Sequence, residues 1–102
     1  MKVVITEPAL ADLREIGDWI ALDNPMRAFE LVEELEADCA GLSENPLRFQ
    51  LVARFESSGV RRRVHGSCLI FYRVDPTEVT VLRILHGARD YEPLIFPREE
   101  DR

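Results

Sequence analysis

Three runs of β-branched and aromatic residues follow one another at residues 60–64, 68–74 and 79–86. Such runs are typical of β-strands. They are separated by residues 65–67 and 75–78, which carry the glycine, proline and aspartate of tight turns. Connections this short join antiparallel neighbours. The C-terminal half therefore predicts an antiparallel sheet.

The N-terminal half has a helical period instead. After a short strand at residues 2–6, apolar residues recur every three to four positions over 7–22 and again over 25–42. Thr6 and Asn24 are suitable N-caps, and a proline stands near the start of each helix. Two helices joined by so few residues must run antiparallel. We expect an α+β fold of order β-α-α-β-β-β, with a helical hairpin packed against an antiparallel sheet that includes the first strand.

The apolar stripes of the two helices predict which side chains face the core. Most acidic side chains are expected off these stripes, and Trp19 is expected to be a packing residue. A buried thiol is the preferred interpretation of Cys39, because it lies within the second stripe. The predicted core positions are Leu10, Leu13, Ile16 or Gly17, and Ile20 on the first helix, and Phe29, Val32, Leu35 or Glu36, Cys39 and Leu42 on the second.

The strands near the C-terminus are apolar on both faces. Residues 69–72 and 81–85 form nearly continuous apolar runs, whereas a sheet with one face in water alternates. Two helices can cover only one face. The other face is either covered by residues 47–58 and the C-terminal segment, or exposed for a partner. Residues 47–58 are themselves compatible with a loop, an extended segment or one helical turn.

Length, charge and cysteine content narrow the class of protein. The 102 residues fit one domain, expected over residues 1–96, with a frayed acidic tail at 97–102. A net charge of −6 disfavours direct DNA or RNA binding. No apolar run reaches the roughly 18 residues of a membrane span. Cys39 and Cys68 alone make neither a disulfide scaffold nor a metal site, and we expect a cytoplasmic protein without cofactors.

Two groups of residues are candidates for chemistry. Arg61 and Arg63 share one face of the first C-terminal strand, with His65 beyond them, and either bind an anion or keep an edge strand soluble. His86 and Arg89 follow the last strand, where they either act as acid–base and charge-stabilising groups or only satisfy the strand end. No glycine-rich phosphate loop, nucleophile elbow or zinc-protease motif is present in the sequence.

Several segments together resemble the ParE branch of the ParE/RelE toxin superfamily. They are residues 6–13, the connection at residues 24–25, and residues 60–67, 69–74 and 81–90. The resemblance covers roughly residues 3–95, and the Leu-Arg-Ile-Leu-His-Gly-Ala-Arg-Asp stretch is its most specific part. It implies a plasmid-stabilisation type of toxin that arrests growth by inhibiting DNA gyrase and is neutralised by a ParD-like antitoxin in a hetero-oligomer. The alternative is a RelE-like, ribosome-dependent mRNA endoribonuclease.

Residue chemistry favours the first of these two activities. RelE-type cleavage draws on a basic cluster, often with lysines, but this chain has one lysine, Lys2, and is acidic overall. The gyrase interpretation assigns no catalytic residue. The RNase alternative assigns the cation cluster and proton donor to Arg61, Arg63, His86, Arg89 and Tyr91. Two features depart from the family pattern. Cys68 stands where relatives commonly carry an aromatic residue, and the segment of residues 47–59 is short.

The resemblance also implies a surface for an acidic antitoxin segment that folds on binding. Such a segment must bury apolar side chains to offset its ordering entropy. We therefore expect an exposed apolar groove with arginines at its rim. The rim is assigned to Arg61, Arg63 and Arg83, and the floor to Leu69, Phe71 and Leu85.

Overall fold

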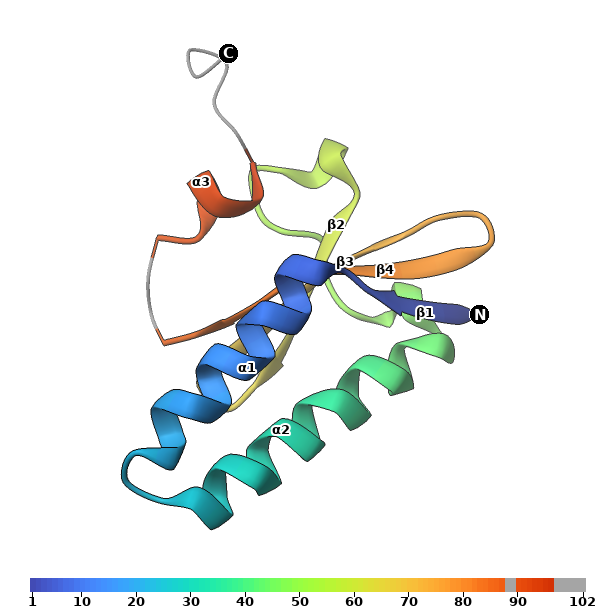
Figure 1. The fold of residues 1–102 in the computed structure, drawn as a ribbon. Coiled ribbons are helices and arrows are strands. Elements are labelled where there is room, and N and C mark those ends of the chain that lie inside the picture. The colour runs from blue at the N-terminus through green and yellow to red at the C-terminus, as the bar shows by residue number, and fades with distance from the viewer. Residues whose placement is uncertain (88–89, 97–102) are drawn as a thin grey trace.

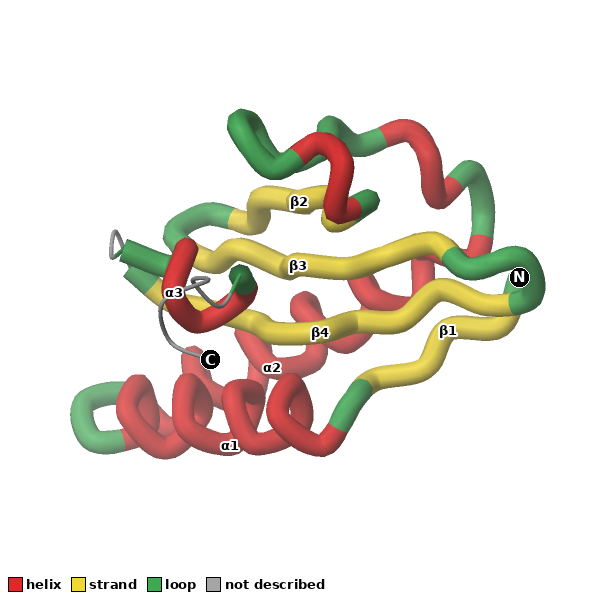
Figure 2. Tube along the Cα trace, turned by 90° about the horizontal axis from the view of Figure 1, so that it is seen from above, coloured by secondary structure: helices red, strands yellow, loops and turns green. Residues whose placement is uncertain are grey.

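A computed structural model describes residues 1–87 and 90–96. The helical hairpin, formed by α1 and α2, lies against one face of a four-stranded sheet, and the short α3 lies over the other (Figures 1 and 2). The elements are β1 (Lys2–Ile5), α1 (Glu7–Ala21), α2 (Pro25–Ala40), β2 (Val60–His65), β3 (Cys68–Val74), β4 (Glu78–His86) and α3 (Glu92–Ile95). The predicted α+β class and element order are confirmed, with bounds within two residues of those expected.

Both predicted N-caps are present. The Thr6 hydroxyl accepts a hydrogen bond from the Ala9 amide at 3.3 Å, and the Asn24 side chain accepts one from the Arg27 amide at 3.0 Å. Each cap satisfies an amide that has no partner inside its helix. The two helices approach closely at Gly17, where an added Cβ would lie 3.2 Å from Val32 Cγ2. Glycine at this position therefore allows the hairpin to close.

The sheet has the order β1-β4-β3-β2 and is mixed rather than antiparallel throughout. The pairs β2–β3 and β3–β4 are antiparallel, as expected, but β1 runs parallel to β4. Figure 2 shows the reason: α1 continues in the direction of β1, and α2 returns the chain to the end where β1 begins. There the Met1 amino group donates a hydrogen bond to the Ser43 carbonyl at 3.1 Å. The strand β2 therefore starts at the same end as β1, and so does β4.

The larger core lies between the hairpin and the sheet. Cys39 and Cys68 are both buried in it, as expected for structural thiols. Its 13 buried residues are Ala9, Leu13, Ile16, Leu31, Leu35, Cys39, Leu42, Cys68, Ile70, Tyr72, Val79, Val81 and Ile84. Two sequence predictions are wrong here, because Trp19 is 65% exposed and Phe29 is 62% exposed. The buried face of α2 follows Ala28, Leu31, Leu35 and Cys39, so the predicted stripe is correct at Leu35 and Cys39 and one position off in the first half of the helix.

The opposite face of the sheet is covered by irregular chain. Its buried residues are Val52, Val60, Phe71 and Leu85; Phe55 of the segment 51–60 and Tyr91, Ile95 and Phe96 of the segment 91–96 pack against them. The Phe55 and Phe96 rings stack across these two segments with centroids 4.0 Å apart. Between Glu44 and Gly59 the chain forms the 3₁₀ turns Pro46–Arg48 and Glu56–Ser58 and one bridge from Leu51 to Arg61. Of the two alternatives for this face, the chain adopts the covered one.

In the residues that the structure describes, no helix has the length and apolar character needed to span a membrane. The expected tail, 97–102, lies outside those residues.

Candidate functional site

The candidate site is a groove between α1 and the part of β4 that has no strand beside it. The pairing of β1 with β4 ends at Ile5 and Val81, whereas β4 continues to His86. Beyond that point side chains from the start of α1 take the place of a neighbouring strand. The Thr6 hydroxyl donates to the Leu82 carbonyl at 3.1 Å, and the Ile84 amide donates to the Asp12 carboxylate at 2.9 Å.

Asp12 is the buried charge at the centre of this groove. Only 7% of the residue is exposed, and its carboxylate also accepts hydrogen bonds from Arg83 Nε at 2.7 Å and Nη2 at 2.9 Å. A buried carboxylate is tolerated when it is paired and hydrogen-bonded in this way. The hydrogen bonds to Asp12 raise the pKa of Arg83 above its usual value, so its guanidinium stays charged and paired with Asp12.

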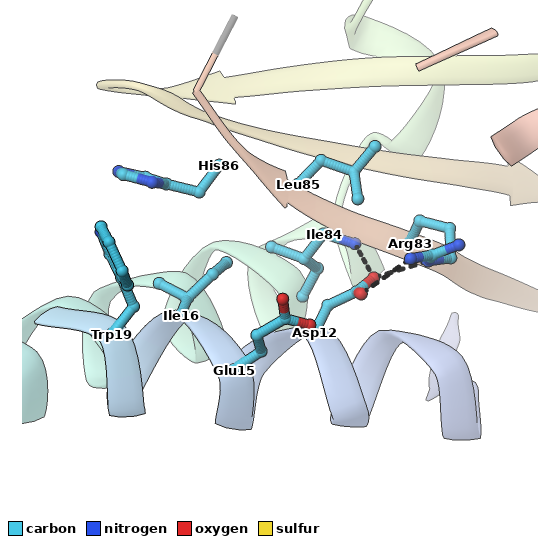
Figure 3. A pocket seen from close by; sticks show the side chains of 8 residues that line it. All are labelled: Asp12, Glu15, Ile16, Trp19, Arg83, Ile84, Leu85 and His86. Carbon is cyan, nitrogen blue, oxygen red and sulfur yellow. Dashed lines mark hydrogen bonds and ion pairs between the residues drawn. The ribbon is translucent and has the colours of Figure 1, made fainter. Parts of the chain in front are cut away.

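A cavity of about 240 Å³ opens beside this ion pair. Figure 3 shows Trp19 on α1 across from His86 on β4, with Glu15 on α1 between Trp19 and Asp12. The lining residues are Asp12, Glu15, Ile16, Trp19, Arg83, Ile84, Leu85 and His86. Carboxylates therefore outnumber guanidinium groups in the cavity, and one aromatic ring stands at its edge.

The predicted arginine pair on β2 is held by internal contacts. Arg61 Nη1 donates to the Phe49 carbonyl at 2.7 Å and to the Leu47 carbonyl at 3.2 Å. Arg63 donates to the Asp38 carbonyl at 3.0 Å, pairs with its carboxylate at 3.2 Å, and stacks over the Phe49 ring. Arg63 therefore joins β2 to α2, and Arg61 joins β2 to the segment that follows α2.

His65 belongs to the same edge of the sheet. Its Nδ1 lies 2.7 Å from the Asp38 carboxylate, and its Nε2 lies 2.9 Å from the Glu34 carboxylate. The hydrogen bond to Glu34 is the main cause that raises the pKa of His65; burial lowers it, and the hydrogen bond to Asp38 raises it further. Arg63 and His65 share a face, as strand alternation predicts, and together they join β2 to α2.

The residues assigned to RNA cleavage do not come together in the described structure. Arg61 and Arg63 are held on the side of β2 that faces the hairpin. Tyr91 lies over the other face of the sheet, where its ring packs 4.8 Å from that of Phe71. His86 lies in the cavity beside α1. Arg89 is outside the described residues.

The expected open groove for the antitoxin is not open. Phe71 and Leu85 are 0% and 3% exposed, because residues 51–60 and 91–96 cover them, while Leu69 is partly buried. Arg83 is not a free rim residue, since it is paired with Asp12 on the α1 side. The sequence indicated that this face is apolar, but it could not decide between the chain's own cover and a partner.

No group of three or more histidine, cysteine or acidic side chains that could hold a metal ion is found in residues 1–87 and 90–96. Burial raises the pKa of Cys39 to about 12, and it also raises that of Cys68. Both thiols are therefore protonated at neutral pH and poor nucleophiles.

Asp12, Glu15 and Trp19 are site residues that the sequence patterns did not identify. Asp12 is among the acidic side chains expected off the apolar stripe, yet it stands three residues after Ala9 and four before Ile16, on the buried face of α1. A lone carboxylate on an apolar stripe is the signal that could have identified it. Its partner, Arg83, similarly interrupts the apolar run at residues 81–85.

The fold and the sequence agree with one family. Residues 3–91 match the family model for the ParE toxin of the type II toxin–antitoxin system parDE. A chromosomal ParDE toxin–antitoxin system from P. aeruginosa has the same fold, with a TM-score of 0.74 and 24% identity over 86% of this chain and 97% of that chain.

A second solved structure is more similar in sequence. The RelBE2 toxin–antitoxin complex from Mycobacterium tuberculosis matches with 30% identity and a TM-score of 0.57, over 83% of this chain and 95% of that chain. No curated protein matches the sequence. Since the family model spans nearly all of the described residues, the chain belongs to the ParE toxin family of type II toxin–antitoxin systems.

Proposed function

We propose that this toxin acts without catalysis, by binding and inhibiting DNA gyrase, and that a ParD-like antitoxin neutralises it. The observation that carries the proposal is the state of the sheet arginines. Arg61 is hydrogen-bonded to backbone carbonyls, Arg63 is paired with Asp38, and Arg83 is paired with Asp12. These three cations already serve to hold the fold together.

An RNA-cleaving site needs the opposite arrangement. Cleavage of a phosphodiester needs cations aimed at the developing negative charge, together with an acid and a base close to it. Here His86 lies in the same cavity as Asp12 and Glu15, whose negative charges repel phosphate. The overall charge of −6 also opposes approach to ribosomal RNA. Inhibition of a protein target requires none of these features.

The alternative remains a RelE-like mRNA endoribonuclease, and the 30% identity to a chain of the RelBE2 complex favours it. In that case the hydroxyl of Tyr91 is the candidate proton donor, and it would act apart from His86, which lies in the cavity beside α1.

For the antitoxin we retain the apolar floor at Leu69, Phe71 and Leu85. An antitoxin segment that reaches Phe71 and Leu85 must first displace residues 91–96, which cover them. The Phe55–Phe96 and Phe71–Tyr91 ring contacts are then exchanged for contacts with the partner. Arg61 and Arg63 contribute less in this proposal than they would at a free rim, because moving them breaks existing hydrogen bonds.

Two assays on the purified chain separate the two targets. In the first, gyrase supercoils relaxed plasmid in the presence of increasing toxin; in the second, a translating ribosome extract is probed for cut mRNA. We expect loss of supercoiling and intact mRNA. The variant Tyr91→Phe keeps the ring packing and removes the hydroxyl, so it should still arrest growth. Cut mRNA together with loss of growth arrest in Tyr91→Phe would establish the nuclease instead.

A further inference from the structure

The proposed gyrase inhibition assigns no role to the cavity beside Asp12, and the backbone of β4 is open there. The Gly87 amide donates to the Ser67 carbonyl on the β3 side at 2.9 Å. Since strand residues alternate, the amides of Ile84 and His86 face the other way, toward α1. The Ile84 amide is taken by Asp12. The Ile84 carbonyl and the His86 amide on the same edge remain directed at the groove.

The charges in the cavity favour a cation. Asp12 and Glu15 supply two carboxylates, and Arg83 supplies one guanidinium, whose Nε and Nη2 bond to Asp12 and which also lies in the field of Glu15. Among the described residues Glu15 has no ion-pair or hydrogen-bond partner of its own. The cavity therefore holds an excess negative charge at the Glu15 end.

Trp19 adds a second feature that suits a cation. Its side chain is 65% exposed although it borders the cavity. A guanidinium or ammonium group over an indole face is stabilised by the ring quadrupole. A cationic side chain lying between Glu15 and Trp19 would satisfy both groups at once, whereas an aliphatic side chain would leave the Glu15 carboxylate unpaired.

We propose that this cavity is a receptor for an arginine or lysine side chain, delivered by an extended segment of a partner protein that pairs with the open edge of β4 at residues 84–86. Main-chain pairing at an open edge supplies affinity, and side-chain pockets beside it supply specificity. The pairing groups are the Ile84 carbonyl and the His86 amide. The site selects against an acidic segment. It borders the apolar floor at Leu85, which also lines the cavity, but it does not include Phe71, which lies under the cover on the other face of the sheet.

The single tryptophan of the chain makes the proposal directly measurable. The probes are three blocked tripeptides, acetyl-Val-Arg-Val-amide and its counterparts with glutamine or glutamate at the centre, titrated at pH 8 while tryptophan emission is recorded. We expect a saturable change with the arginine peptide, binding about tenfold weaker with glutamine, and none with glutamate. Equal affinity for the arginine and glutamine peptides, or no saturation by the arginine peptide, would overturn the proposal.

Matched variants locate the interaction. Glu15→Gln should weaken arginine-peptide binding about fivefold and leave glutamine-peptide binding unchanged, since only the charge is removed. Glu33→Gln removes an exposed charge on α2, away from the cavity, and should have no effect on either peptide. An unchanged affinity in Glu15→Gln would contradict the proposal. Because no gyrase is present, the result is independent of the supercoiling assay.

Discussion

The two faces of the sheet are covered in different ways. The layer between the hairpin and the sheet contains 13 buried residues contributed by both sides, whereas the layer between the opposite face and its cover of 3₁₀ turns and the one-turn helix α3 contains four. Helices satisfy their own backbone groups, so their packing surface can be continuous and fixed. An irregular cover has fewer internal hydrogen bonds and less buried apolar area to hold it in place.

The polar contacts follow the same division. The hairpin is joined to the sheet by the Asp12–Arg83 pair and by Asp38, which binds both Arg63 and His65. Within the irregular cover, the backbone around Leu51 is bonded to β2, with Val52 donating to the Val60 carbonyl at 2.9 Å and Arg62 donating to the Gln50 carbonyl at 3.0 Å. Residues 91–96 are held by the exposed pair Arg54–Glu92 and by a long contact of 3.4 Å from Arg62 to the Tyr91 hydroxyl. We infer that the hairpin face forms the stable scaffold, and that the opposite face can be uncovered without unfolding it.

The largest expected effect compares two buried leucines. Leu35→Ala should cost about 4 kcal/mol of unfolding free energy and Leu85→Ala about 2 kcal/mol, because the irregular cover can collapse into the space left by Leu85 while the helices cannot. Urea denaturation of both variants measures this. Equal losses would mean that the two faces are equally rigid.

The next effect concerns the buried carboxylate. Asp12→Ala leaves the Ile84 amide and the Arg83 guanidinium without their partner, so it should cost about 3 kcal/mol. Glu92→Ala, which removes the exposed pair on the opposite face, should cost less than about 0.5 kcal/mol. A loss from Glu92→Ala as large as that from Asp12→Ala would contradict the contrast between the faces.

A smaller effect is expected from removing α3. A chain that ends at Asp90 uncovers Phe71 and should lose about 1–2 kcal/mol, with increased binding of a hydrophobic dye and unchanged helical circular dichroism. A chain that ends at Phe96 is the control, since it separates the role of residues 91–96 from that of the residues after them. Loss of the helical signal in the shorter chain would show that the scaffold depends on this cover.

The elements of the hairpin face could be predicted from the sequence, whereas the cover of the opposite face could not. Both helices and the three antiparallel strands were predictable because their periods and caps are local signals. The parallel pairing of β1 depends on the path of the hairpin, which no local pattern encodes. The exposed Trp19 and the buried Asp12 were missed because helix periodicity alone leaves the width of the buried face uncertain by one position. The covered state of Phe71 depends on residues 51–60 and 91–96, where the sequence has no periodic pattern.

The smallest effect tests the edge of the hairpin face through pH. Contacts with Glu34 and Asp38 raise the pKa of His65 above 6.5, and hydrogen bonds from Arg27 and His65 lower the pKa of Glu34 below 4.5. A raised histidine pKa means that protonated His65 stabilises the fold below about pH 6.5, and that this stability is lost as pH rises through the folded-state pKa. Above pH 5 the Glu34 carboxylate is mainly ionised in both the folded and the unfolded state, so the change in stability above that pH is due to His65.

The melting temperature of wild type minus that of His65→Gln should therefore be larger at pH 5.5 than at pH 8.5, by a few degrees at most, because the cluster is partly exposed. Glu34→Gln removes the main cause of the shift while Arg63 still holds Asp38, so in that background the pH dependence of the His65→Gln difference should mostly disappear. An equal difference at the two pH values would mean that His65 joins β2 to α2 as a neutral hydrogen-bonding group. The ionic contribution to this edge would then come from Arg63 and Asp38 alone.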